Sequence, residues 1–291
     1  MDVLLADTLA MRPWLARSRS RRAALQSGTL QLMDVDRLLA TAETNLGRLA
    51  GDVLVIPVYG AIQYRMDLCC YFCGGVSVQG ISNALTLGLA NPACARIVLD
   101  IDSPGGTYCG TPELAESIFA ARGLKPITAV VNPCCASGAL WIAAAAKRVV
   151  SLRSGFVGSI GTVMELETFY RFYQEAGVDH AVLRNPPTKA EYSDVEPFSE
   201  GLLAYSQAMV DTITTEFTAA VARYRGTTPK DVAANYGQGR MLSATAAKAA
   251  GLIDAISSLE TELGGKPKSG KSGPRNAFQT RLLRPSPLGQ I

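Results

Sequence analysis

The sequence has no run of apolar residues long enough to cross a membrane. A transmembrane helix needs roughly 18 or more consecutive apolar residues. The longest candidate, residues 138–146 (GALWIAAAA), is much shorter and ends at Lys147 and Arg148. The basic start of a signal peptide is also missing, because Asp2 and Asp7 occupy that region and the arginines come later. We therefore expect a cytoplasmic protein without a membrane span.

Histidine is almost absent, since His180 is the only one in 291 residues. Any Ser–His–Asp triad would have to use it. It follows Gly-Val-Asp in an expected helix-to-strand connection, which lies at the end of a βαβ unit opposite the usual active site. A Gly-x-Ser-x-Gly elbow is missing as well. These absences disfavour a histidine-based hydrolase.

The cysteines lack the pattern of a disulfide framework, because their number, seven, is odd and two pairs are adjacent. This favours a reducing compartment. Cys70 and Cys73 form a C-x-x-C, but a zinc site needs further ligands, and His180 lies far along the chain. We interpret Cys69, Cys70 and Cys73 as free thiols in a hydrophobic loop, and we expect neither a metal nor a cofactor.

Acidic residues are missing from two stretches, 11–22 and 266–291, which makes both ends basic although the formal net charge is only +3. Such stretches can bind nucleic acid, but solvated tails are the commoner explanation. No obligate nucleic-acid partner is expected. Hydrophobic residues make up 48% of the chain and charged residues 18%, which is typical of a folded globular protein.

The composition divides the chain into a helical N-terminal extension (1–50), a folded domain (51–263) and a flexible basic tail (264–291). In the folded domain, short apolar strands alternate with helices. The strands are expected at 53–58, 96–102, 127–131, 148–152 and 181–184. The main helices are expected at 78–89, 112–122, with Thr111 as N-cap, and 197–225. This alternation predicts an α/β fold with a largely parallel sheet flanked by helices.

Two motifs lie where strands of this sheet should end, which is where parallel sheets carry their chemistry. Gly105 and Gly106 follow a strand in the turn DSPGG; they permit positive φ and close approach of a ligand to backbone N–H groups, as an oxyanion hole requires. An ordinary tight turn is the alternative. Ser137 lies among small residues at the start of a helix, whose free N–H groups can stabilise an anion. A simple N-cap is equally compatible with that position.

A serine nucleophile needs a base, and a lysine in its neutral form can supply it. Lys189 follows a stiff Asn-Pro-Pro-Thr segment just after an expected strand. A solvated surface lysine is the commoner fate, and spacing alone does not favour Lys189. Cys134 and Cys135, close to Ser137, are an alternative nucleophile, although buried small residues explain them as well.

Taken together, these motifs resemble the signal peptide peptidase A family, and especially its shorter relatives in phage and prophage head-assembly modules. The similar segments occur in family order between about Val53 and Ile256. They are VLVIPVYG (53–60), GGVS (74–77), IVLDIDSPGG (97–106), ASGALWIA (136–143), VGSIGTV (157–163), the segment with Lys189 and Pro197, and AAGLID (249–254). The sequence differs from the family pattern at Thr188, where an aromatic residue or histidine often precedes the base, and in having no membrane anchor.

The resemblance implies a fold like that of the ClpP and crotonase superfamily, with repeated ββα units. It implies a serine endopeptidase with a Ser–Lys dyad that cleaves peptides or proteins, such as capsid or scaffold proteins or residual signal peptides. It assigns the nucleophile to Ser137, the base to Lys189, and the oxyanion donors to the backbone of Gly105 or Gly106 and of Gly138. It also implies homo-oligomers whose active sites line a bowl or ring.

Two alternative functions stay open from the sequence. The chain could be an inactive relative that serves as an assembly or scaffold protein, or an enzyme of crotonase-like acyl-CoA chemistry, although no nucleotide-binding loop is evident. Independently of these, the acid-free tail at 265–291 could enter a neighbouring active site and be trimmed there.

Overall fold

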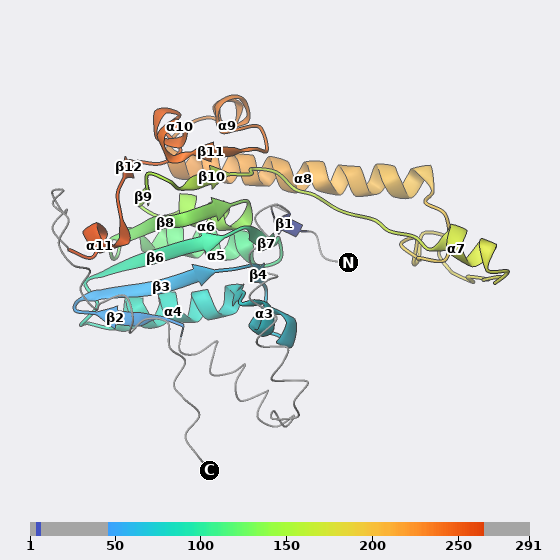
Figure 1. The fold of residues 1–291 in the computed structure, drawn as a ribbon, viewed down its shortest axis with the longest axis horizontal. Coiled ribbons are helices and arrows are strands. Elements are labelled where there is room, and N and C mark those ends of the chain that lie inside the picture. The colour runs from blue at the N-terminus through green and yellow to red at the C-terminus, as the bar shows by residue number, and fades with distance from the viewer. Residues whose placement is uncertain (1–3, 7–45, 265–291) are drawn as a thin grey trace, which may run out of the picture.

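The structure is a computed structural model that describes residues 4–6 and 46–264 (Figure 1). Most of the expected helical extension and the C-terminal tail, with its hypothetical trimming site, lie outside these residues. The parts of the extension that are described contain strands instead of a helix. These are β1 (Leu4–Ala6) and β2 (Arg48–Ala50).

The main sheet is largely parallel, as predicted, with the order β11-β10-β8-β6-β3-β2. Its long strand β8 pairs with β6 on one edge; on the other edge it pairs with β9 in its first half and with β10 in its second half. Antiparallel partners, β2 and β11, lie at the two ends of this order. The strands are β3 (Val53–Tyr59), β6 (Arg96–Ser103), β8 (Ile127–Ala136), β9 (Arg148–Ser151), β10 (Phe156–Gly158), β11 (Met241–Ser243) and β12 (Ala255–Ile256).

A second, smaller sheet lies at the carboxyl end of β6. It has the order β1-β7-β4-β5, and its strand β7 (Gly105–Thr107) follows β6 directly after Pro104. Its other strands are β4 (Ile62–Gln63) and β5 (Val76–Ser77). The two glycines of the SPGG motif are therefore part of a strand, β7, that pairs with β1 on one edge and with β4 on the other.

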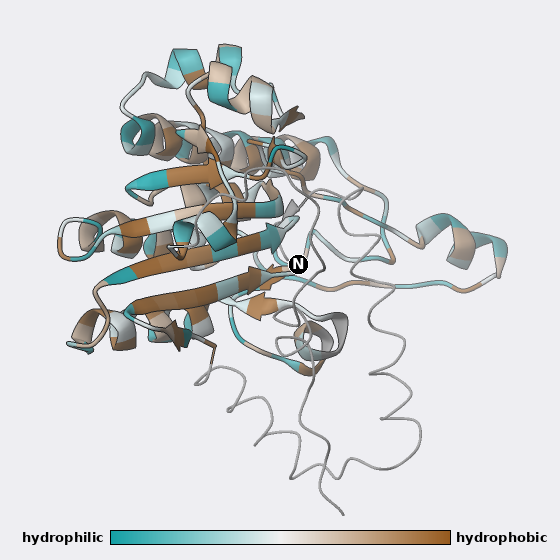
Figure 2. Cartoon of the chain, turned by 60° about the vertical axis from the view of Figure 1, so that its left-hand side comes forward, coloured by the Kyte–Doolittle hydropathy of each residue, from teal (hydrophilic) through white to brown (hydrophobic). Residues whose placement is uncertain are grey.

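Helices cover both faces of the main sheet, whose strands are mostly hydrophobic (Figure 2). The larger core lies under α4, α5, α6 and α8, where the rings of Trp141 and Phe217 stack with centroids 4.5 Å apart. A smaller core on the other face packs against Leu259 and Leu263 at α11. The helices are α3 (Leu68–Cys73), α4 (Val78–Ala90), α5 (Thr111–Ala121), α6 (Gly138–Ala144), α7 (Tyr170–Glu175), α8 (Glu200–Arg225), α9 (Pro229–Asn235), α10 (Ala244–Ala249) and α11 (Leu259–Glu262).

Two local predictions are wrong. Thr111 is the first helical residue of α5, because Gly110, with a φ of 79°, takes the N-cap position and the Thr111 hydroxyl donates to the Thr107 carbonyl (2.7 Å). Residues 181–184 form no strand. They belong to a projecting segment that has no sheet edge beside it, so their β-branched and apolar character is not used in pairing.

This projecting segment, residues 161–199, leaves the sheet after β10 and returns at α8; we call it the arm (Figure 1). No residue from 161 to 201 is buried. Its two limbs are joined beside α7, where Phe169 N–H donates to the Asp194 carbonyl (2.7 Å). Large apolar side chains are nevertheless exposed on it, including Leu183 at 96% and Phe172 at 64%. Such exposure is expected of a surface that packs against another molecule.

Among the described residues, no helix combines the length and apolar character that a membrane span requires.

A buried carboxylate lies in the middle of the main sheet. Asp100 of β6 is only 3% exposed and accepts hydrogen bonds from the Tyr59 hydroxyl and the Asn132 side-chain amide (3.0 Å). Burial raises the pKa of Asp100, and the two hydrogen bonds oppose that effect only in part. Partial burial of the Tyr59 hydroxyl, together with the negative charge of Asp100, raises the pKa of that hydroxyl.

We expect Asp100→Asn to remove a pH dependence from the stability. Because the folded-state pKa of Asp100 lies above its unfolded value, its contribution to the free energy of unfolding is fully present below the unfolded pKa and is lost as pH rises through the folded pKa. In urea denaturation, the variant should therefore gain stability relative to the wild type as pH rises above about 4, the usual pKa of an unfolded aspartate. Asp52→Asn, at an exposed position, is the control. A wild type that gains stability on the variant over this range would contradict the prediction.

Candidate active site

Ser137 occupies a strained turn between β8 and α6. Its backbone has φ 53° and ψ −124°, a conformation that costs a non-glycine residue about 1–3 kcal/mol. The residue is 2% exposed. It stands at the N-cap position of α6, yet its hydroxyl makes no capping hydrogen bond. The N-cap interpretation therefore does not explain this serine, whereas strain of this kind is typical of functional residues.

The segment Gly-Ser-Ile-Gly (158–161) holds this turn in place. Ser137 N–H donates to the Gly158 carbonyl (2.9 Å), and β10 runs parallel to β8 with Gly158 opposite Ala136. Gly158 has a φ of 147°, and a Cβ there would lie 2.4 Å from the Arg240 carbonyl oxygen. In the sequence, this segment is recognisable only as a family mark. Its role beside the serine depends on strand pairing, which spacing along the chain does not reveal.

The glycine strand β7 lies at the same end of the sheet as Ser137. Ser103 in β6 is paired with Cys135 in β8. Gly105 comes two residues after Ser103 in the chain, and Ser137 comes two residues after Cys135. Gly105 has a φ of 95°, and its N–H donates to the Ser103 hydroxyl (3.1 Å), which in turn donates to the Gly60 carbonyl (2.6 Å).

Gly106 is required by close backbone packing. A Cβ at this position would lie 1.9 Å from the carbonyl oxygen of Ile62 in β4. The glycine pair therefore allows β7 to lie directly against β4. An ordinary tight turn would not need this contact. The two glycines therefore belong to a paired strand and not to a simple turn.

Lys189 is not part of this arrangement in a single chain. It is exposed on the arm, where its backbone N–H donates to the Pro186 carbonyl (2.9 Å). Within the described part of the chain, its amine has no hydrogen bond or ion pair. His180 is exposed on the same arm with its ring against Tyr173, 4.6 Å between centroids. The structure therefore groups Ser137, Gly138, Gly105 and Gly106 and leaves both candidate bases on the arm.

The cysteines beside Ser137 differ in environment. Cys135 is completely buried, and burial raises its pKa well above the ordinary value. A buried thiol of raised pKa is a poor nucleophile because the thiolate is the reactive form. Cys134 is partly exposed, and it lies three residues before the strained turn. No group of three His, Cys, Asp or Glu side chains is placed to hold a metal ion within residues 4–6 and 46–264.

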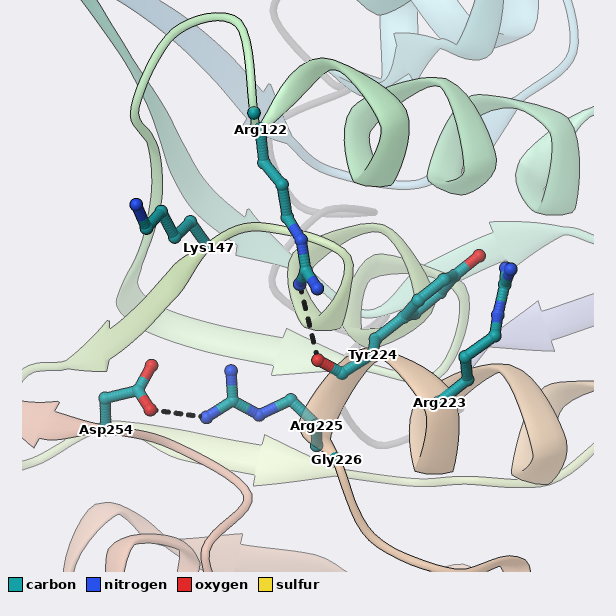
Figure 3. Close-up of a pocket in the computed structure, with 8 residues that line it drawn as sticks. Arg122, Lys147, Arg223, Tyr224, Arg225, Gly226 and Asp254 are labelled. Atoms are coloured by element: carbon teal, nitrogen blue, oxygen red, sulfur yellow. Dashed lines mark hydrogen bonds and ion pairs between the residues drawn. The ribbon is translucent and has the colours of Figure 1, made fainter.

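A basic cavity of about 500 Å³ lies at the opposite end of β8, close to its first residue (Figure 3). Arg122, Lys147 and Arg225 line it. Arg122 is the C-cap of α5, Arg225 is the last residue of α8, and Lys147 lies three residues after the end of α6. Cations at these ends complement the negative ends of the helix dipoles. Arg225 also pairs with Asp254 (2.6 Å), whose carboxylate accepts from Val149 N–H (2.7 Å). These charges therefore serve the fold, and the final Asp of AAGLID ties α8 to the sheet.

Comparison with known proteins gives consistent matches. Residues 120–264 match Peptidase family S49. The chain is 28% identical over 228 residues to the head-tail preconnector protein GP5 of Enterobacteria phage P21, covering 77% of this chain and 46% of that protein. It is 27% identical over 175 residues to the capsid assembly protease C of Escherichia phage lambda, covering 60% and 40%.

The chain thus spans less than half the length of these two curated relatives. Among solved structures, a point mutant of ClpP1 from Listeria monocytogenes aligns with a TM-score of 0.46 and 14% identity, over 79% of this chain and 98% of that one. The family match covers α6, the serine turn, the arm and α8. Through residues 120–264, the chain is similar to peptidase family S49.

Proposed function

We propose that the protein is a serine endopeptidase in which Ser137 is the nucleophile, Lys189 is the base, and the backbone N–H groups of Gly106 and Gly138 hold the oxyanion. Of the two candidate glycines in β7, Gly106 is proposed because Gly105 N–H already donates to the Ser103 hydroxyl. The single observation that carries this proposal is the strained, uncapped Ser137 beside a glycine strand that already pairs with a peptide strand, β1. A nucleophile, a helix start and a strand edge for an extended peptide are the parts that peptide hydrolysis requires.

The proposed reaction follows from these positions. The Ser137 oxygen attacks the carbonyl carbon of the peptide while the base takes its proton. The first N–H groups of α6, beginning at Gly138, have no partner within the helix and would stabilise the developing negative charge. The amine then leaves with the proton, and water releases the acyl group from Ser137. Since the base must be deprotonated, activity should rise toward alkaline pH.

The exposure of Lys189 gives the proposal a further requirement. A lysine amine acts as a base only where its surroundings favour the neutral form, and burial is the usual cause. In a single chain Lys189 is exposed, and no residue of the arm is buried. We infer that the arm of one copy packs onto a second copy and brings Lys189 to that copy's Ser137. The exposed Phe172 and Leu183 supply the apolar surface for this contact.

The substrates that we propose are capsid or scaffold proteins of a phage or prophage. One similar protein is the capsid assembly protease C of phage lambda, and another is the head-tail preconnector protein GP5 of phage P21. An assembly-dependent active site suits such substrates, because it stays incomplete until several copies have gathered.

Labelling with a fluorophosphonate tests the proposed function. The reagent should modify Ser137 in the assembled protein, as located by mass spectrometry of its peptides, and Ser137→Ala should stay unlabelled. Prior alkylation of thiols should leave the labelling unchanged, whereas a cysteine nucleophile at position 134 would lose activity. An oligomer that takes up no label would favour the inactive scaffold protein instead.

A further inference from the structure

The chain already seats one of its own segments on the glycine strand. β1 (Leu4–Ala6) pairs antiparallel with β7, with Leu4 opposite Thr107 and Ala6 opposite Gly105 (Figure 1). The other edge of β7 is taken by β4. β1 therefore occupies the one edge of β7 that an extended peptide substrate would need.

The direction of β1 matches that of the acyl side of a substrate. Because the pairing is antiparallel, the chain runs from Leu4 at the far end of β7 to Ala6 at its Gly105 end. Gly105 and Ser137 both lie two residues beyond the paired Ser103 and Cys135. The last carbonyl of β1 thus approaches the end of the sheet where the serine stands.

We propose that the protein is its own first substrate, and that Ser137 cleaves the peptide bond that follows Ala6. A bond forms between the Ser137 oxygen and the Ala6 carbonyl carbon, the bond to the Asp7 nitrogen breaks, and the serine proton passes through the base to that nitrogen. Water then hydrolyses the ester and releases the segment that ends at Ala6. This inference rests on the proposed function and needs no reactant besides water.

The position of β1 also makes the cleavage dependent on assembly. While Lys189 lies exposed on the arm, β1 covers the substrate edge of β7 beside a serine that has no base. The arrival of a second copy's arm supplies the base, removes β1 and opens the edge to other peptides. The first turnover therefore activates the site.

Intact-mass spectrometry of the full chain tests the proposal. Assembled wild type should lose the mass of everything up to Ala6, whereas Ser137→Ala should keep it. Leu5→Pro removes the N–H of the residue opposite Gly106 and disturbs strand pairing, so cleavage should slow at least about tenfold. Leu5→Ala, which keeps that N–H, controls for loss of the side chain and should be cleaved faster than Leu5→Pro.

Fluorophosphonate labelling in the same samples separates this inference from the proposed function. Wild type that is labelled at Ser137 but keeps an intact segment around Ala6, or that is cleaved at a distant bond, overturns the self-cleavage alone. Equal loss of the segment in Ser137→Ala also overturns it, because a host protease would then be responsible. Wild type that is neither labelled nor cleaved overturns both.

Discussion

Replacement of Ser137 by alanine is expected to lower peptide turnover by about 10⁴- to 10⁶-fold, the loss that follows removal of a serine nucleophile in other peptidases. The fold should not suffer, because the hydroxyl caps no helix and alanine is no more strained than serine at a φ of 53°. Cleavage of a pool of internally quenched peptides measures the rate, and thermal unfolding measures the stability. Ser154→Ala, at an exposed turn position, is the matched control and should keep full activity.

Ser137→Gly sharpens this prediction. Glycine adopts positive φ without the steric cost that serine bears, so this variant should be inactive and also more stable, by up to about 1 kcal/mol. A variant that gains stability and loses activity would indicate that the backbone strain at Ser137 is retained because the function requires it. Full turnover in Ser137→Ala, or a Ser137→Gly variant that is less stable than Ser137→Ala, would contradict the role assigned to this turn.

The central sheet is predictable because its signals are local. Apolar, β-branched runs between turn residues predicted β3, β6 and β9 to within a residue or two. The prediction for β8 stopped at Val131 because Asn132 and Pro133 resemble the end of a strand. The strand continues to Ala136 because its second half gains a new partner, β10. Long-range pairing of this kind has no local signal.

The candidate site divides in the same way. Ser137 and the two glycines of β7 could be named from the sequence, since strand-to-helix junctions of parallel sheets carry function. The strain at Ser137 and the support from Gly158 became visible only in three dimensions. β1 lies in a stretch for which helix was expected, and its strand character comes from the unpaired edge of β7. A partner across the sheet has overridden local propensity.

The location of Lys189 could not be predicted from spacing. The sequence places it after an expected strand that would have returned it to the sheet, but residues 181–184 make no pairing and the arm projects outward. A stretch that carries apolar residues and buries none within one chain is consistent with a segment whose partner surface lies on another copy. The sequence of one chain records such a partner only as apolar residues without a core.

A mixture of two inactive variants is therefore expected to regain activity. Lys189→Ala keeps Ser137, and Ser137→Ala keeps Lys189. If each site takes the serine from one copy and the lysine from another, random assembly of equal amounts should give about a quarter of the wild-type number of complete sites. If both residues came from the same chain, no mixture would contain a complete site. The first arrangement predicts about a quarter of the wild-type activity, and the second predicts none above background.

The mixing experiment needs co-expression of the two variants, so that subunits assemble together, and peptide cleavage as its measurement. Each variant alone sets the background, and Lys230→Ala, which removes another exposed lysine from the described part of the chain, is the matched control for Lys189→Ala. Paired replacement of Phe172 and Leu183 by serine should abolish the recovery, because the arm would lose the apolar contact that we infer between copies. If activity is still recovered after this replacement, another surface joins the copies. If co-assembled Ser137→Ala and Lys189→Ala variants recover no activity, the base lies in the same chain as Ser137.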